Sequence, residues 1–206
     1  MYRNPCAAAA AMPAGSAERN IMEELIKQIE EYIPFNKQEE RDKAQMLAFL
    51  RSGAELITRD NPVAHLTASA WVINPDRSQV IMVYHNLYKS WSWMGGHADG
   101  DWDLLRVAKK EVMEECGLQE LTVVSPEIFS LEILCVSGHE KKGQYLSSHL
   151  HLNVTYLFEA DPAQPLRIKP DENSGVAWVA VEDIPEKTNE AWFRERIYSK
   201  LQKKAE

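Results

Sequence analysis

The sequence predicts an α/β fold in which helices cover both faces of a mixed sheet. Segments with the composition of β-strands recur along the chain, and amphipathic segments with helical periodicity lie before, between and after them. Turn residues between some of the strands predict hairpins, so the sheet must contain antiparallel pairs. Strands interleaved with helices bury their apolar side chains in a layered structure, which is the basis of this fold prediction.

Two helices are predicted ahead of the first strand, over residues 21–33 and 37–51. Asn36 and Glu39 have the spacing of a capping box at the start of the second helix, and Gly53 would end it. We expect the apolar side of this helix to pack on the domain, with a dimer surface as the alternative; it consists of Met46, Leu47, Phe49 and Leu50. Residues 1–21 are rich in small side chains and are predicted to be a disordered tail.

The strand predictions rest on β-forming residues bounded by turn residues. They cover residues 65–74, 79–84, 121–124, 127–136 and 149–158. Residues 74–78 have turn chemistry, so the first two strands should form a hairpin. Residues 137–148 are predicted to be a polar loop. Residues 190–203 have the pattern of an amphipathic C-terminal helix.

The strand at 149–158 alternates between apolar and polar side chains, as a half-buried strand does. Its apolar face consists of Leu150, Leu152, Val154, Tyr156 and Phe158, and its polar face of His149, His151, Asn153 and Thr155. Two histidines on one face are compatible with a metal site or a substrate contact. No third ligand stands at a diagnostic spacing, so a polar face open to solvent or to a cleft is favoured over a zinc site.

The segment from Gly95 to Leu118 gives the clearest functional signal. It predicts a helix that begins after an N-cap at Asp103 and ends at Gly117. The apolar stripe of this helix consists of Leu105, Ala108, Val112 and Cys116. One side of the helix can therefore pack inward while another stays accessible.

Three carboxylates lie together on this helix. Residues three and four apart share a helix face, so Glu111 must lie beside Glu114 and Glu115. Like charges at this distance repel, and a hard cation that prefers oxygen ligands, such as Mg²⁺ or Mn²⁺, would relieve the repulsion. A solvated acidic face is the alternative, but the double glycine before the helix and Gly117 after it argue against that. The segment predicts a site for a divalent cation and a diphosphate.

These residues resemble the Nudix box, in which glycine, five residues, glutamate and seven residues lead to Arg-Glu-apolar-any-Glu-Glu-any-Gly-apolar. The matching positions are Gly96, Glu111, Val112, Glu114, Glu115, Gly117 and Leu118. Residues 91–96 resemble the strand end and turn before the box, and Glu172 followed by Trp178 and residues 179–184 resembles the closing strand of the family. The resemblance covers roughly residues 62–185 and implies the α/β/α sandwich of the Nudix fold, here with an N-terminal helical extension.

Two positions depart from the family pattern. Lys110 stands where the family has arginine, which keeps the charge but loses the planar fork that can hold a carboxylate at two points. Trp102 stands where the first glutamate belongs. Asp99 and Asp101 lie next to it and are candidates to replace the missing carboxylate.

The resemblance implies a metal-dependent hydrolase that cleaves the pyrophosphate bond of a nucleoside diphosphate linked to another moiety. It implies that Mg²⁺ or Mn²⁺ is held by Glu111, Glu114, Glu115 and the carbonyl of Gly96. Among the catalytic carboxylates, Glu111 and Glu172 are both candidates for the general base. Substrate contacts are expected from Gly95, Gly96, His97, Lys110 and Trp93.

Some of these substrate contacts have alternatives. His97 either contacts phosphate, orients a neighbouring aspartate or points to water. Trp91 and Trp93 share a face of a strand, so they either stack on a nucleobase or pack in the core together. For the whole chain, Trp102 and Lys110 favour a second hypothesis, a catalytically impaired nucleotide-binding or metal-binding regulatory module. An isoprenoid diphosphate isomerase is disfavoured because no matching cysteine motif is present.

Composition narrows the organisation and the partners. The chain has 206 residues, 45% of them hydrophobic, which is enough for one well-buried domain and predicts a single domain over residues 22–206. This domain is expected to consist of a helical preface at 22–60, a core at 61–185 and a C-terminal helix at 186–206. A net charge of −8 without a basic run disfavours nucleic acid as a partner. No apolar run has the length needed to span a membrane. Three cysteines without a pairing pattern predict a cytoplasmic protein.

Overall fold

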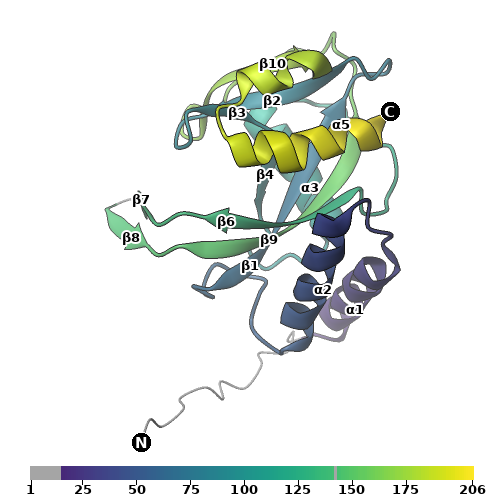
Figure 1. The fold of residues 1–206 in the computed structure, drawn as a ribbon, viewed down its shortest axis with the longest axis vertical. Helices are drawn as coiled ribbons and strands as arrows, with labels where there is room; N and C mark the ends of the chain where they lie inside the picture. The colour runs from purple at the N-terminus through teal and green to yellow at the C-terminus, as the bar shows by residue number, and fades with distance from the viewer. Residues whose placement is uncertain (1–14, 142) are drawn as a thin grey trace, which may run out of the picture.

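The computed structural model describes residues 15–141 and 143–206 and is built around an 8-stranded mixed sheet (Figure 1). The strands of this sheet are β1 (Ala64–Ile73), β2 (Gln79–His85), β3 (Ser90–Ser92), β4 (Met94–His97), β5 (Thr122–Val123), β6 (Ser130–Val136), β9 (His149–Glu159) and β10 (Asn173–Ala180). The longer helices are α1 (Ser16–Glu31), α2 (Lys37–Arg51) and α3 (Leu104–Cys116). The chain closes with the short helices η1 (Val181–Asp183) and α4 (Ile184–Lys187), the π-helical η2 (Phe193–Tyr198), and α5 (Ser199–Ala205).

Parallel and antiparallel pairs both occur in this sheet. The main path runs β10-β2-β1-β9-β5, while β3 pairs with β2, β4 with β1 and β6 with β9. β1 and β9 are parallel along their whole length, from Ala64↔Leu150 to Ile73↔Glu159. The other pairs are antiparallel, including the hairpin of β1 and β2 through Ile73↔Val80. The predicted mixed sheet and its first hairpin are confirmed.

Helices cover both faces of the sheet. Consecutive strand residues alternate between two hydrophobic cores: Val72 and Ile81 belong to the first, Trp71 and Met82 to the second. Because successive side chains of a strand point to opposite faces, the two cores lie on opposite sides of the sheet. α1, α2 and α3 contribute to the first core, and α4, η2 and α5 to the second. The predicted α/β/α sandwich is confirmed.

The N-terminal helices pack on the domain. Met46, Leu47 and Leu50 of α2 are buried in the first core, and Phe49 is partly buried against it, so this stripe is not an open surface. α1 begins at Ser16, ahead of the predicted start, although residues 16–21 are all exposed and the buried residues of this helix are Leu25 and Ile29. The tail prediction is therefore wrong for residues 16–21, and residues 1–14 lie outside the described part of the chain.

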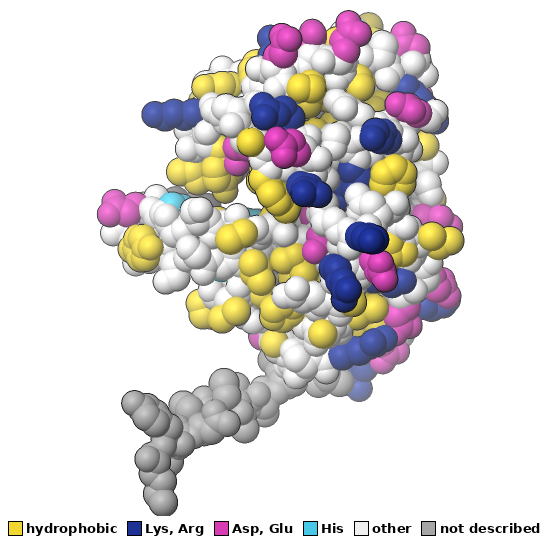
Figure 2. Space-filling model, viewed as in Figure 1, with side chains coloured by type: hydrophobic (Ala, Val, Ile, Leu, Met, Phe, Trp, Pro, Cys, Tyr) yellow, Lys and Arg dark blue, Asp and Glu magenta, His cyan; other side chains and the backbone are white. Residues whose placement is uncertain are grey.

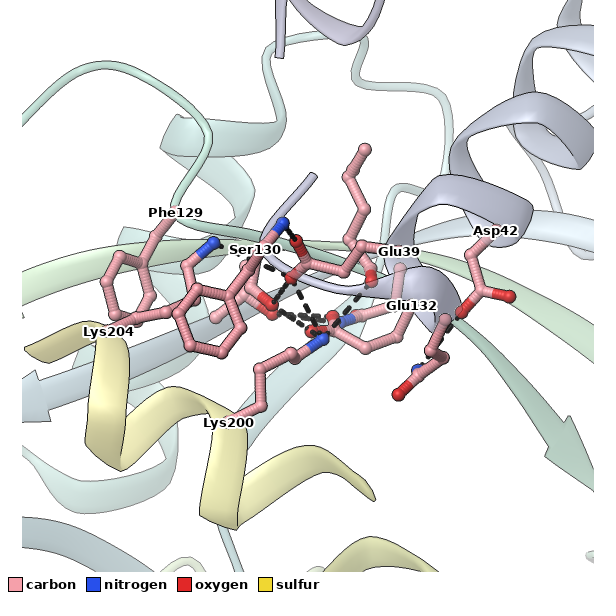
Figure 3. Close-up of polar contacts among 12 residues, drawn as sticks. Glu39, Asp42, Phe129, Ser130, Glu132, Lys200 and Lys204 are labelled. Carbon is pink, nitrogen blue, oxygen red and sulfur yellow. Dashed lines mark hydrogen bonds and ion pairs between the residues drawn. The ribbon is translucent and has the colours of Figure 1, made fainter. Parts of the chain in front are cut away.

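A buried polar network joins α2, β6 and α5 (Figure 3). Nζ of Lys200 lies 2.8 Å from Glu132 and 3.1 Å from Glu39, and all three side chains are at most 2% exposed. Ser130 donates to Glu39 at 2.8 Å. Burial raises the pKa of Glu39, but Lys200 and neighbouring donors more than offset this, so its pKa is lowered. The amide of Glu39 also donates to the N-cap Asn36, which confirms the predicted cap.

Two predicted element types are wrong. Residues 137–148 were expected to be a polar loop, but they hold a second hairpin of β7 (His139–Lys141) and β8 (Gln144–Leu146) that extends past the main sheet (Figure 1). All of β8 is exposed, so it lacks the apolar alternation that marks a strand. β10 ends at Ala180, and the predicted strand at 179–184 continues as short helices because Pro185 suits a first helical turn.

The surface carries charges of both signs. On the face drawn in Figure 2, Lys and Arg side chains are interspersed with Asp and Glu side chains over the upper and right-hand parts of the molecule. Among the described helices, none combines the length and the apolar character that a membrane crossing requires.

Candidate active site

α3 begins and ends where the local sequence signals predict. The side chain of Asp103 accepts a hydrogen bond from the amide of Arg106 at 3.0 Å, and Gly117 has a φ of 75°, the left-handed conformation that ends a helix. The inward face of α3 consists of Leu104, Val107, Ala108, Val112, Glu115 and Cys116. One carboxylate is thus buried together with the apolar stripe.

The two glycines of β4 allow α3 to approach the sheet closely. β4 pairs with β1 through Ser69↔Gly95 and Ala68↔Gly96. A Cβ atom on Gly96 would overlap the carboxylate of Glu111, and a Cβ atom on Gly95 would overlap Ser69. Any side chain at position 96 would displace Glu111, so the glycine is required by the position of that carboxylate.

Glu115 is the most deeply buried carboxylate of the cluster, with 5% of its surface exposed. Its Oε1 accepts a hydrogen bond from the amide of Gly95 at 3.0 Å. Burial, together with the charges of Glu111 and Glu172, raises the pKa of Glu115 to about 8, although the Gly95 amide acts in the opposite direction. Burial and the charge of Glu114 also raise the pKa of Glu111. The fold therefore holds carboxylates that repel one another in a poorly solvated place.

Lys169, which was not among the predicted site residues, forms ion pairs with two carboxylates at the exposed edge of this cluster. Nζ of Lys169 lies 3.4 Å from Glu114 and 3.0 Å from Glu172, and both carboxylates are about half exposed. Asn173 is buried, accepts from the amide of Lys169 at 3.2 Å and donates to the carbonyl of Glu115 at 3.0 Å. The turn before β10 is thereby fixed to the end of α3. The sequence holds only a weak signal for Lys169, its position three residues before Glu172.

The two departures from the family pattern have distinct surroundings. Lys110 lies 3.6 Å from Glu114 and is largely exposed, whereas Trp102 packs against the first core. Asp101 receives two hydrogen bonds from Arg106, at 2.8 and 2.6 Å. Asp99 is paired with Arg59, a residue outside the box and distant in the sequence. Each aspartate beside Trp102 is thus held by an arginine.

Trp93 does not lie where a substrate contact was expected. It is 8% exposed and packs in the second core, with its ring edge-on to Tyr198 at 5.8 Å between ring centres. Trp91 is half-buried and packs against the same core, so the two tryptophans share a face as predicted. Its ring faces the second core, so the structure does not place Trp93 with the other predicted substrate contacts beside Gly96 and α3.

His97 lies against other imidazoles. Its ring centre is 5.0 Å from that of His65 and 4.8 Å from that of His151. Burial, followed by the neighbouring imidazoles, lowers the pKa of His151 to about 2, and burial lowers the pKa of His65, so both rings are neutral at pH 7. The cluster could not be predicted from spacing in the sequence, because its members come from three different strands.

The structure therefore brings together the predicted residues Gly95, Gly96, Glu111, Glu114, Glu115 and Glu172, adds Lys169, and places Lys110 at the rim. The side-chain donors in this cluster are carboxylate oxygens, which suit Mg²⁺ or Mn²⁺ better than zinc. Such a site can hold a hard cation beside a polyphosphate.

The chain was compared with protein families, curated proteins and solved structures. A family model described as the NUDIX domain matches residues 63–201. No curated protein matches the chain. Among solved structures, the Ap4A hydrolase of C. elegans in a binary complex is 18% identical, with 68% of this chain and 93% of that chain covered and a TM-score of 0.47.

Two further structures are similar to the same part of the chain. Dihydroneopterin triphosphate pyrophosphohydrolase of E. coli is 12% identical, with 70% of this chain and 97% of that chain covered and a TM-score of 0.49. The NUDIX domain of Shewanella oneidensis NrtR complexed with ADP ribose is 15% identical, with 68% and 88% covered and a TM-score of 0.48.

Proposed function

The chain belongs to the Nudix family, whose hydrolases act on phosphorus-containing anhydrides, and from this premise we propose that it cleaves the pyrophosphate bond of a nucleoside diphosphate linked to another moiety. The observation that carries the proposal is the packing of Glu111 and Glu115 against the two glycines of β4. Burying mutually repelling carboxylates opposes folding, and a divalent cation bound to their oxygens would offset that cost.

We propose that Glu111, Glu114, Glu115 and the carbonyl of Gly96 hold Mg²⁺ or Mn²⁺. When bound, the ion would offset the charge of the diphosphate and make a water molecule more acidic. The raised pKa values of Glu111 and Glu115 support this assignment, because burial and neighbouring carboxylates disfavour their charged forms and a bound cation would favour them.

The chain also supplies groups beside the carboxylates that could contact a phosphate. Lys169 lies between Glu114 and Glu172 and would hold an anionic phosphate oxygen near the carboxylates. Lys110, at the exposed rim, is proposed as a second phosphate contact. Gly95 and Gly96, which are exposed and partly buried respectively, are proposed as backbone contacts to a bound phosphate.

Glu111 and Glu172 are the two candidates for the general base. Glu111 is partly buried and its pKa is raised, which brings it toward the range in which a base works at neutral pH. Glu172 is more exposed and is held by Lys169. Replacing the base by glutamine should remove the acidic limb of the pH profile of kcat, whereas replacing the other residue should lower activity and keep that limb.

We also propose that the substrate is a small nucleotide derivative. The net charge of −8 does not attract such an anion over long range, so positive side chains close to the site must hold it. The buried Trp93 does not supply a stacking surface for its base. The cysteine content supports a cytoplasmic location. The homodimer remains a prediction.

A regulatory module without turnover is the second candidate function. It is favoured by one observation, that Trp102 packs against the core where the family pattern has a glutamate. Such a module would keep metal or nucleotide affinity and lack hydrolysis.

The test is phosphate release from a panel of nucleoside diphosphate derivatives, coupled to a phosphatase, with Mg²⁺, Mn²⁺ or EDTA. Turnover that requires the metal, on any member of the panel, supports the hydrolase and names its substrate class. Nucleotide binding in a calorimeter with no turnover would support the regulatory module instead.

A further inference from the structure

Five of the six histidines of the chain gather at one end of β1, β4 and β9, next to the β7–β8 hairpin. They are His65, His97, His139, His149 and His151. The sheet itself creates this gathering, because the parallel pairing of β1 with β9 sets His65 directly beside His151. On the other side of β1, the pairing with β4 sets His97 beside Thr67.

The rings are spaced as ligands of one ion would be. In the described part of the chain, one nitrogen each from His65, His97 and His151 lies within 4.8 Å of the other two. Ring centres are 5.0 Å apart for His65 and His149 and 5.1 Å for His149 and His151. Imidazoles bound to a tetrahedral zinc ion at about 2.0–2.1 Å have ring centres about 5 Å apart and bound nitrogens about 3.3 Å apart.

Hydrogen bonds to the backbone fix which ring nitrogen carries the lone pair. Nδ1 of His65 lies 3.2 Å from the carbonyl oxygen of Asn61, and a carbonyl can only accept, so Nδ1 carries the proton. Nε2 of His65 is buried and has no hydrogen-bond partner among residues 15–141 and 143–206. A buried lone pair without a partner destabilises the fold, and a metal ion would relieve that cost.

His149 is held in the same way. Its Nδ1 lies 2.8 Å from the carbonyl oxygen of Ser147, so its Nε2 also has a free lone pair, and that atom lies 3.3 Å from Nε2 of His151. Two imidazole nitrogens at this distance either share a proton or share a cation. Orientation of a ligating histidine by a carbonyl on its far nitrogen is the usual arrangement in metal sites.

We propose that His65, His97 and His151, with His149 as the fourth ligand, form a binding site for a transition-metal ion of the zinc class. Imidazole nitrogen suits Zn²⁺, Ni²⁺ or Cu²⁺ and does not suit Mg²⁺, so this site is chemically separate from the carboxylate cluster of α3. The ion would join β1, β4 and β9 at the residue that follows Gly96. It would thereby fix the end of β4, which carries Gly95 and Gly96.

The experiment is a Zn²⁺ titration of untagged full-length protein stripped with a chelator, read by a competing chromophoric chelator in the presence of excess Mg²⁺. We expect one equivalent of Zn²⁺ to bind and the melting temperature to rise with it. His65→Gln and His151→Gln should each lower the affinity at least about 100-fold, because each removes a ligand rather than an outer partner. His149→Gln should lower it less.

Two variants serve as controls. His85→Gln removes the one histidine outside the cluster and should bind Zn²⁺ as the wild type does. Glu115→Gln should also keep Zn²⁺ binding, so a failure of the proposed hydrolase chemistry leaves this result unchanged. If His65→Gln does not fold by circular dichroism, the half-buried His149 and His151 variants decide the matter.

Zn²⁺ binding that survives in both the His65 and His151 variants would overturn the proposal. The absence of stoichiometric binding to the wild type in excess Mg²⁺ would overturn it as well, and would assign the 3.3 Å contact of His149 and His151 to a shared proton.

Discussion

Glu115 occupies the most constrained position among the carboxylates of α3. It is buried, it accepts a hydrogen bond from Gly95, and nearby carboxylates repel its charge. The sequence predicted that this residue would share a face with Glu111, because helix geometry is local. It did not predict the depth of its burial, which depends on how closely α3 approaches β4.

The burial of Glu115 predicts a pH dependence of stability for the metal-free protein. Its pKa rises from 4.5 in the unfolded chain to about 8 in the fold, so between these values the folded state binds a proton that the unfolded state has lost. The free energy of unfolding should therefore fall as the pH rises from about 5 to 8, by on the order of a few kcal/mol. Urea unfolding in EDTA across this range measures it.

Glu115→Gln is the matched variant for this effect. It keeps the shape of the side chain and removes its titration, so its stability should change less over the same pH range. An equal change in both proteins would show that Glu115 does not carry the effect.

Asp101→Asn tests whether this aspartate replaces the glutamate missing at position 102. Because both of its oxygens are held by Arg106 in an exposed pair, we expect turnover to stay within about threefold of the wild type and stability to fall by at most about 1 kcal/mol. The same rate and metal dependence should be seen with Mg²⁺ and Mn²⁺. A loss of turnover that extra metal restores would assign Asp101 to the metal site.

Elements with local signals were predictable, and elements without them were not. The ends of α3 follow from Asp103 and Gly117, which act on the adjacent backbone. The β7–β8 hairpin follows from no apolar pattern, since β8 is wholly exposed and is held by backbone pairing with β7. Trp93 was ambiguous because a strand side chain can reach either face, and only the sheet defines which face covers the core.

At the level of elements, α5 is joined to α2 and β6 through Lys200. Lys200→Met should destabilise the protein by about 3–5 kcal/mol, because Glu39 and Glu132 would remain buried without their partner. The exposed Lys203→Met, one turn of helix further on, is the control and should change stability by less than about 0.5 kcal/mol. Equal effects of the two substitutions on the urea midpoint would refute the role of this network.

The whole molecule depends on contacts between residues far apart in the chain. The parallel pairing of β1 with β9 brings His65 beside His151, and the turn at Lys169 reaches the carboxylates of α3. Neither could be predicted from spacing, because the order of strands in the sheet is a tertiary property. The family resemblance supplied the sandwich and the carboxylate roles, and it gave no sign of the histidine cluster.

The N-terminal helices should unfold together with the sheet. Leu25 and Ile29 of α1 and Leu47 of α2 belong to the same core as β1. Hydrogen exchange under mild denaturant should therefore give the most protected amides of α2 the same opening free energy as those of β1. A lower opening free energy throughout α1 and α2 would instead show that these two helices unfold as a separate unit.

The most direct test of the central claim is metal-dependent turnover of the wild type and Glu115→Gln, measured side by side on the best substrate of the panel. We expect the variant to keep its fold by circular dichroism and to lose at least about 100-fold in kcat/KM, because one metal ligand is removed. Turnover of the folded variant at the wild-type rate would contradict the assignment of the carboxylate cluster as the active site.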